Sequence, residues 1–252
     1  LVRSRGLGDV YKRQGDILTL NHTEASFADK NVGNNKTVNV SGISASGADA
    51  ANYSVTTTTA TTANITPKTL SASATASNKV YDGNTSASVT LGDDRISGDT
   101  LTLKHTSATF ADKNAGNNKA VSVTGISASG TDAANYSVAT TTASTTANIS
   151  PKPVAYVGTV ANKVFDDTTA ATLESQSLSG ATAGDAGVIA GDVVTVGNGS
   201  ANFENKEVGA GKAVLITGFA LAGADAGNYT FVSTSATAKA DITAPAATPT
   251  PA

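Results

Sequence analysis

The chain has 252 residues with no Cys, Met or Trp, and its formal net charge at pH 7 is −3. Without Cys there is no disulfide, thiolate metal site or cysteine nucleophile, and a slightly acidic chain lacks the clustered Lys and Arg that bind nucleic acid. No apolar run approaches the roughly 18 residues that span a bilayer, so we expect no nucleic-acid partner and no membrane insertion.

The first fourteen residues differ from the rest of the chain. The segment LVRSRGLGDVYKRQ contains four of the 17 basic residues and one of the 20 acidic ones. It has neither the apolar region nor the small-residue cleavage site of a signal peptide. We interpret residues 1–14 as a non-repeat segment that is foreign to the sequence after it, with a divergent linker as the alternative.

From residue 15 onward the chain consists of three copies of one pattern. Residues 15–55 and 98–138 agree at most positions, and a diverged third version begins at Gly191. Copy two also has an upstream block, residues 69–91, which has a counterpart in copy three and none in copy one. A fixed repeat of this size indicates tandem modules. The predicted domains are a truncated copy one at 15–68, a complete copy two at 69–152, a diverged copy three with a longer loop at 153–244, and a Pro/Ala/Thr linker at 245–252.

Apolar residues alternate with polar ones inside each copy. Leu101 and Leu103 alternate with Thr, and Val121 and Val123 flank Ser122. This period of two is typical of a half-buried strand, and Gly and Asn turn signals separate the runs. We therefore predict an all-β chain of tandem small β-sandwich modules of the immunoglobulin-like type, with β-grasp-like modules as the alternative. Because copy one lacks the upstream block, its apolar face should be partly uncovered.

A tyrosine recurs at the same position of each copy, four residues after an aspartate. This is the spacing of a tyrosine corner, in which the hydroxyl closes back on the backbone at the end of a sandwich. A polar turn before an ordinary strand is the alternative. The three pairs are Asp49 and Tyr53, Asp132 and Tyr136, and Asp225 and Tyr229.

Few residues are candidates for chemistry. His22 and His105 occupy one repeat position without a second His or Cys, so we expect them on outward strand positions. Asp112, Asn114 and Asn118 are weak Ca²⁺ candidates because oxygen ligands alternate along a calcium loop. A hairpin turn that uses Asn and Gly explains them better. We expect no enzyme activity, no catalytic residue and no cofactor.

Several segments of copy two resemble the YDG repeat, namely KVYDG at Lys79, GDTLTL at Gly98 and ANISPK at Ala147. The resemblance covers about residues 15–244. YDG repeats occur in tandem in secreted, filamentous-haemagglutinin-like adhesins of bacteria. The resemblance therefore implies an extracellular location on the bacterial cell surface and a repeated, non-catalytic module.

The motif Tyr81-Asp82-Gly83 itself predicts a turn. We expect Tyr81 to be more exposed than the corner tyrosines. Copy three has Phe165-Asp-Asp167 at this place. Asp167 is compatible with the turn if the position needs a positive φ, because Asp also visits that region.

These observations together predict a structural role. We expect a stalk or spacer segment of a bacterial adhesin, whose partners are the neighbouring modules of the same chain. The alternative is an adhesive module that binds a host glycan or protein. Such a module needs an aromatic platform or loops that vary between copies, whereas copies one and two are nearly identical.

Overall fold

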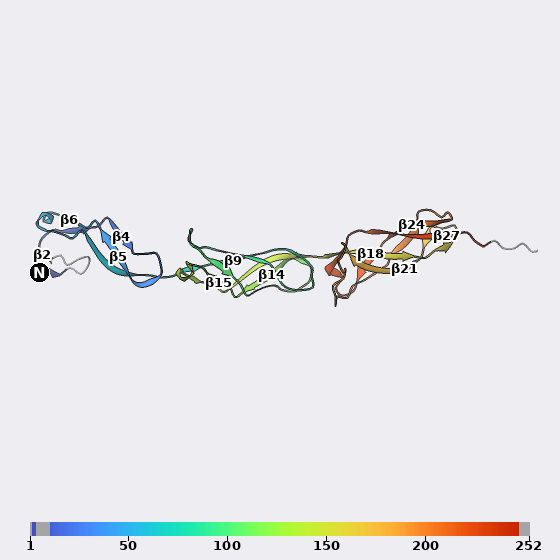
Figure 1. The fold of residues 1–252 in the computed structure, drawn as a ribbon, viewed down its shortest axis with the longest axis horizontal. Helices are drawn as coiled ribbons and strands as arrows, with labels where there is room; N and C mark the ends of the chain where they lie inside the picture. Colours follow the sequence, from blue (N-terminus) through green and yellow to red (C-terminus); the bar gives the residue numbers. More distant parts are fainter. Residues whose placement is uncertain (1, 4–10, 247–252) are drawn as a thin grey trace, which may run out of the picture. The chain divides into compact units, whose positions relative to one another are not determined.

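The computed structural model describes residues 2–3 and 11–246 (Figure 1). These residues form strands, turns and short 3-10 helices but no α-helix, which confirms the all-β prediction. No helix within them is long and apolar enough to cross a membrane. Residues 1 and 4–10 of the predicted non-repeat segment and residues 247–252 of the predicted linker lie outside the described part.

The strands are short, and each copy contains one 3-10 helix that ends directly before its repeated tyrosine. The first elements, up to the end of copy one, are β1 (Val2–Arg3), β2 (Tyr11–Lys12), β3 (Thr19–Asn21), β4 (Glu24–Phe27), β5 (Gly33–Ser41), β6 (Ser44–Ser46), η1 (Ala50–Asn52) and β7 (Thr58–Ile65).

Copies two and three repeat the elements from β3 to β7, add others before them and add one strand directly after the 3-10 helix. In copy two they are β8 (Lys68–Leu70), β9 (Ala72–Ala76), β10 (Lys79–Val80), β11 (Val89–Asp93), β12 (Thr102–Lys104), β13 (Ser107–Phe110), β14 (Gly116–Thr124), β15 (Ser127–Ser129), η2 (Ala133–Asn135), β16 (Tyr136–Val138) and β17 (Thr142–Ser150). In copy three they are β18 (Lys152–Val160), β19 (Lys163–Val164), β20 (Ala170–Ala171), β21 (Leu173–Gly180), β22 (Thr195–Gly197), β23 (Ser200–Phe203), β24 (Gly209–Thr217), β25 (Ala220–Ala222), η3 (Ala226–Asn228), β26 (Tyr229–Phe231) and β27 (Ser235–Thr243).

The chain divides into two compact units whose boundary runs through copy two. Unit 1 contains copy one and one part of copy two, and unit 2 contains the other part of copy two and all of copy three. Each unit therefore contains one boundary between successive copies. Unit 1 comprises Leu1–Ser73, Leu91–Thr106 and Gly125–Ala143, and unit 2 comprises Ala74–Thr90, Ser107–Thr124 and Ser144–Ala252.

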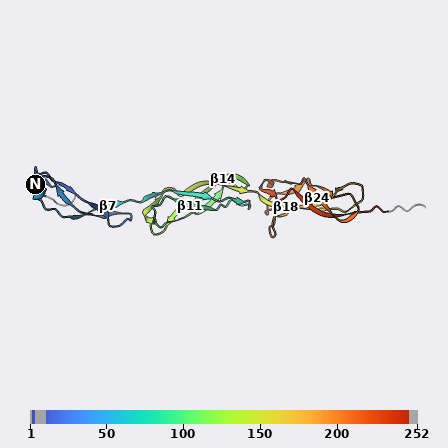
Figure 2. The ribbon, with the colours of Figure 1, turned by 90° about the horizontal axis from the view of Figure 1, so that it is seen from above.

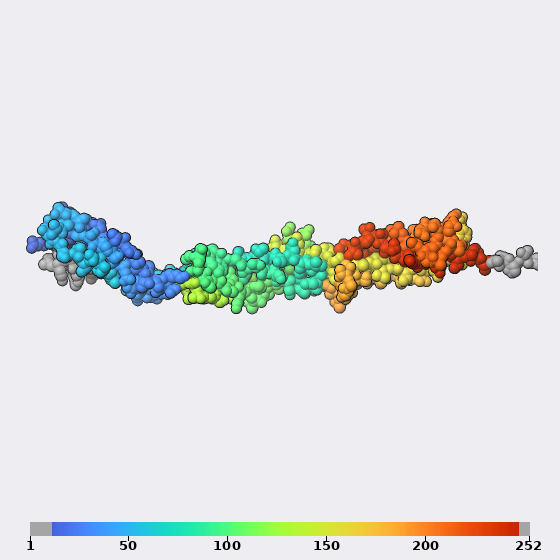
Figure 3. Space-filling model, turned by 45° about the horizontal axis from the view of Figure 1, so that its top comes forward, coloured from blue at the N-terminus to red at the C-terminus, as the bar shows by residue number. Residues whose placement is uncertain are grey.

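Copy three, which lies wholly in unit 2, contains the antiparallel pair β22–β25 and two larger sheets. One has the strand order β21-β18-β26 and the other β19-β27-β24-β23-β20. The pairs β18–β26 and β19–β27 are parallel, and the remaining pairs in these sheets are antiparallel. Figures 1 and 3 show the yellow β18–β21 part and the orange-to-red β24–β27 part as two layers. The buried core residues come from both: Tyr156, Val160, Ala201, Phe203, Val214, Ile216, Ala240 and Ile242.

The part of copy two in unit 1 is organised around a pair of parallel strands. Strand β8 pairs with β16, and this register places Leu70 opposite Val138. Leu70, Leu101 and Tyr136 form one buried cluster, against which Val138 packs. In unit 2, Val121 and Val123 of β14 are fully buried whereas Ser122 between them is exposed. The predicted alternation is thus present in the sheet.

Copy one forms an antiparallel sheet β4-β5-β7 and the pair β3–β6. Figure 1 labels β4, β5 and β6, and Figure 2 labels β7. Its buried apolar residues are Val40 and Ile43. Phe27 of β4 is 40 % exposed, whereas its counterparts Phe110 and Phe203 are each 3 % exposed. The prediction that the apolar face of copy one is partly uncovered is confirmed.

Candidate functional site: a joint between successive copies

The YDG turn of copy two is organised around a lysine. Lys79 Nζ donates to Asp82 Oδ1 at 2.7 Å and to the carbonyl oxygens of Asn84 and Ser86 at 2.8 and 3.0 Å. The same ammonium lies 5.4 Å from the centroid of the Phe110 ring, within cation–π range. An ammonium has three donors and no acceptor, so it suits a loop that turns several oxygens inward.

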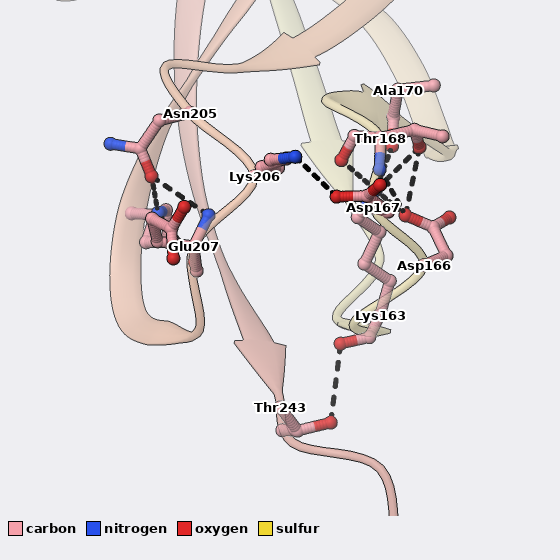
Figure 4. A network of polar contacts seen from close by, with 10 residues as sticks. Lys163, Asp166, Asp167, Thr168, Ala170, Asn205, Lys206, Glu207 and Thr243 are labelled. Carbon is pink, nitrogen blue, oxygen red and sulfur yellow. Dashed lines mark hydrogen bonds and ion pairs between the residues drawn. The ribbon is translucent and has the colours of Figure 1, made fainter.

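Copy three has the same arrangement (Figure 4). Lys163 Nζ donates to Asp166 Oδ1 at 2.7 Å and lies 5.5 Å from the Phe203 ring centroid. The hydrogen bond from Lys163, with further ones from Thr168, lowers the pKa of Asp166 to about 2. The φ angles of Gly83 and Asp167 are 78° and 62°, so the expectation of a positive φ at this position is met.

The expectation that Tyr81 is more exposed than the repeated tyrosines is wrong, since Tyr136 is 8 % and Tyr229 is 5 % exposed. Tyr81 is 2 % exposed. Its hydroxyl donates to Asp192 Oδ2 of copy three at 2.7 Å, and its ring meets Tyr229 edge-on at 5.5 Å. A turn of this kind is exposed in an isolated module, but here copy three covers it.

The hydroxyl of each repeated tyrosine accepts from a backbone N–H 40 residues earlier in the chain, not from one a few residues upstream as in a tyrosine corner, and it also donates to a carboxylate. The hydroxyl of Tyr136 accepts from the backbone N–H of Ile96 at 2.9 Å and donates to Asp99 Oδ2 at 2.6 Å. The aspartate four residues earlier, Asp132, accepts from the N–H of Thr100 at 2.9 Å. The other two copies repeat both contacts. The hydroxyl of Tyr229 accepts from the N–H of Ile189 and donates to Asp192, and Asp225 accepts from the N–H of Val193. The hydroxyl of Tyr53 accepts from the N–H of Arg13 and donates to Asp16, and Asp49 accepts from the N–H of Ile17.

Four residues form what we call the acceptor end of a copy. They are the repeated tyrosine, the aspartate that its hydroxyl binds, the aspartate four residues before the tyrosine, and the asparagine directly before the tyrosine. The acceptor ends are Asp16, Asp49, Asn52 and Tyr53 in copy one; Asp99, Asp132, Asn135 and Tyr136 in copy two; and Asp192, Asp225, Asn228 and Tyr229 in copy three.

In unit 1 a loop of copy one docks on the acceptor end of copy two. Lys30 Nζ contacts Asp99 Oδ1 at 2.5 Å and Asp132 Oδ1 at 2.8 Å. Asn135 accepts from the N–H of Val32 at 2.9 Å and donates to Asn31 Oδ1 at 3.2 Å. One lysine thus bridges two carboxylates of copy two. The side-chain amide of Asn135 uses both its oxygen and its nitrogen to bind the loop of copy one.

In unit 2 the equivalent loop of copy two docks on copy three in the same way. Lys113 Nζ donates to Asp192 Oδ1 at 2.8 Å and lies 3.9 Å from Asp225 Oδ1. Asn228 accepts from the N–H of Ala115 at 2.8 Å and donates to Asn114 Oδ1 at 3.2 Å. We call residues 30–32, 113–115 and 206–208 the donor loops, and each docked pair a joint.

The ionisable groups of the joint in unit 2 keep their protonation states over a wide range of pH. Burial by itself raises the pKa of Asp192, but hydrogen bonds from Lys113, Tyr229 and Tyr81 outweigh it and hold that pKa below its usual range. The hydrogen bond from Lys113 to Asp192 is the main cause that raises the pKa of the lysine. Burial and the bond to Asp192 raise the pKa of Tyr229 to about 12. Asp192, Lys113 and Tyr229 therefore all keep their neutral-pH forms well beyond pH 7 in both directions.

The Ca²⁺ candidates have separate partners. Asp112 Oδ1 accepts from Lys119 Nζ at 2.6 Å, so an ammonium occupies that carboxylate. Asn114 faces Asn228, and Asn118, with a φ of 51°, donates its N–H to Asn148. Within the described residues no group of three or more His, Cys, Asp or Glu could hold a metal ion. His22 and His105 are both exposed.

A comparison with known protein families matches the chain in three segments, one for each copy. The family model of the YDG domain matches residues 3–61, 66–143 and 150–238. No curated protein and no solved structure matches the chain. The first match begins inside the segment interpreted above as foreign, and there the N–H of Arg13 takes the place of the N–H of Ile96 against the repeated tyrosine. A backbone N–H can do so whatever the side chain.

Proposed function

Since the chain belongs to the YDG domain family, we propose that it is a non-catalytic stalk segment of a secreted bacterial surface adhesin. The observation that supports this most directly is the joint, which occurs twice with the same residue types. A spacer must hold neighbouring modules in a set orientation, and a charge-assisted hydrogen bond to a buried carboxylate does so better than a flexible linker. The partners in this role are the neighbouring repeats.

We infer further that a complete module is a small immunoglobulin-like β-sandwich. The supporting feature is that two sheets of copy three share one buried core, with Tyr156 and Val160 from one sheet and Phe203, Val214 and Ile216 from the other. The parallel pairing of β18 with β26 places the first strand of the module beside a late one.

The alternative is a module that binds a host glycan or protein. One pocket in unit 2 favours glycan binding, because three asparagine side chains line it and amides can hydrogen-bond to sugar hydroxyls. Two of its three amides already serve the protein: Asn78 accepts from the N–H of Asn148 at 2.7 Å, and Asn148 accepts from the N–H of Asn118 at 2.8 Å. The lining holds no aromatic platform, which supports the spacer instead. It consists of Asn78, Ala115, Gly116, Asn117, Asn148, Ile149, Ser150, Pro151 and Gly227.

Surface display separates the two functions. The chain is placed between a bacterial membrane anchor and a reporter head that binds an immobilised ligand. A spacer should present the head better than a Gly/Ser linker of equal residue number, whose end-to-end distance grows only with about the square root of its length. Display without the head should leave the bacteria non-adherent to host cells. Adherence of the headless form would overturn the proposal in favour of the adhesive module.

A further inference from the structure

Copy one has an acceptor end that no donor loop fills within the described residues. Lys30 serves the acceptor end of copy two, and Lys113 serves that of copy three. The acceptor end of copy one is nevertheless formed in the same way. The hydroxyl of Tyr53 donates to Asp16, and Asp49 accepts from a backbone N–H at 2.8 Å, as in the filled copies. Asn52 is exposed.

This surface fits a donor loop of the same family. It has the same Asp, Asp, Asn and Tyr as the acceptor end of copy two, and the loop that fills copy two supplies a lysine followed by an asparagine and an N–H group. Because the carboxylates are already oriented before any lysine arrives, little ordering is needed when one binds.

Copy three does not offer a matching donor loop (Figure 4). Lys206 is at the position of Lys113, but its Nζ binds Asp167 of its own copy at 2.5 Å. The residue of copy two that corresponds to Asp167 is Gly83. A Cβ added at Gly83 would lie 3.1 Å from a methyl carbon of Ile189 in copy three. A side chain at this place therefore both holds the docking lysine back and crowds the next copy.

Two more substitutions act in the same direction. Phe165 stands where Tyr81 donates its hydroxyl to Asp192. Glu207 stands where Asn114 meets Asn228, so a carboxylate would approach two others at an acceptor end. Like charges placed opposite each other select against a partner.

From these contacts we infer that the acceptor end of copy one is a docking surface for the donor end of another YDG repeat, and that the donor end of copy three is closed to docking. The inference rests on the proposed role of the joint. It predicts a head-to-tail contact, which is heterologous and propagates from chain to chain once both ends are open.

The experiment opens the closed end. Full chains that carry Phe165→Tyr, Asp167→Gly and Glu207→Asn are compared with the wild type by sedimentation equilibrium from about 10 µM to about 1 mM, the range in which a single weak joint would act between molecules. The wild type should keep its monomer mass of 24.9 kDa throughout. The average mass of the triple variant should rise at least twofold with concentration.

A second variant identifies the surface that is used. Asn52→Lys, added to the triple variant, puts a cation where the docking lysine arrives and should restore the monomer mass. Unchanged circular dichroism verifies folding, and the double variant Asp167→Gly/Glu207→Asn serves if Phe165→Tyr disturbs the core. A monomeric triple variant, a wild type that associates equally well, or association that survives Asn52→Lys would each overturn the inference. None of these results touches the joints inside one chain, so the stalk proposal would stand.

Discussion

Copies one and two have nearly the same sequence over residues 15–55 and 98–138, yet they bury it differently. Phe110 is covered by the upstream block of copy two, since Lys79 lies over its ring and its N–H donates to the carbonyl oxygen of Thr85 at 2.8 Å. Phe27 has no such block and is 40 % exposed. The burial of this phenylalanine is therefore set by residues 69–91 and not by the strand that carries it.

The joint, by contrast, survives the loss of that block. Copy one still docks on copy two through Lys30, and its own acceptor end is formed. The joint in unit 1 lacks only the hydrogen bond that Tyr81 donates to Asp192 in the joint of unit 2, because Tyr81 has no counterpart in copy one. The docking residues and the residues that complete the core are thus separate parts of the repeat.

Removing the phenylalanine side chain should have the greatest consequence, because Phe110 is buried and Phe27 is 40 % exposed. Phe110→Ala should cost about 3–5 kcal/mol of local unfolding free energy, because it leaves a cavity in a packed core. The matched change Phe27→Ala should cost less than about 1 kcal/mol, as at other exposed sites. Amide hydrogen exchange resolved by copy measures both. Equal losses would show that copy one is covered in solution.

The next effect concerns the lysine of the YDG turn. Lys79→Met keeps most of the apolar stem but strands the carbonyl oxygens of Asn84 and Ser86, so it should cost about 1–3 kcal/mol. Exchange of the amides in residues 82–88 should report the loss. Lys104 is exposed and serves as the control, since Lys104→Met should stay within about 0.5 kcal/mol of wild type. If Lys79→Met behaves like Lys104→Met, the ammonium does not hold the turn.

A smaller effect sharpens the difference between the two joints. Tyr81→Phe removes one donor to Asp192 and should weaken the unit 2 joint by about 1 kcal/mol, which makes it resemble the unit 1 joint. The N–H of Ala115, which docks on Asn228, is the reporter in hydrogen exchange. An unchanged exchange rate at Ala115 would mean that the tyrosine only fills space.

The smallest effect is the response to acid. The pKa of Asp192 is lowered in the folded chain, so its contribution is complete above the unfolded value near 3.9 and is lost as the pH falls through the folded pKa. The pKa of Lys113 is raised, so its contribution is lost only at alkaline pH. Protection of Ala115, corrected for intrinsic exchange, should stay flat near neutrality and fall below about pH 4. Asp192→Asn should abolish that acid dependence, and an early fall near pH 6 would contradict the assignment.

The sequence was sufficient for the strands and the repeat, because alternation and recurrence are local signals. Val121, Ser122 and Val123 illustrate this, and β8 and β18 begin at Lys68 and Lys152, one residue before the predicted starts of copies two and three. The joint could not be predicted in this way. Which surface of a module a neighbour covers depends on the fold, so the sequence alone predicts Tyr81 to be more exposed than the repeated tyrosines and Asn114 to be a ligand or a turn residue. The signal that was available is recurrence itself: Lys30 and Lys113 are the same residue in successive copies.

We infer that the donor loop fixes one copy against the next, and a distance distribution across the joint tests this inference. The chain has no Cys, so nitroxides on cysteines introduced at the exposed Ser122 and Thr230 report on one pair of sites within unit 2.

The wild type should give a narrow distribution, and Lys113→Ala with Asn228→Ala should broaden it. The matched pair Lys206→Ala and Glu207→Ala, in the donor loop of copy three, should leave it narrow. A distribution that is already broad in the wild type, or equally narrow after the loss of Lys113 and Asn228, would show that the donor loop does not fix copy two against copy three.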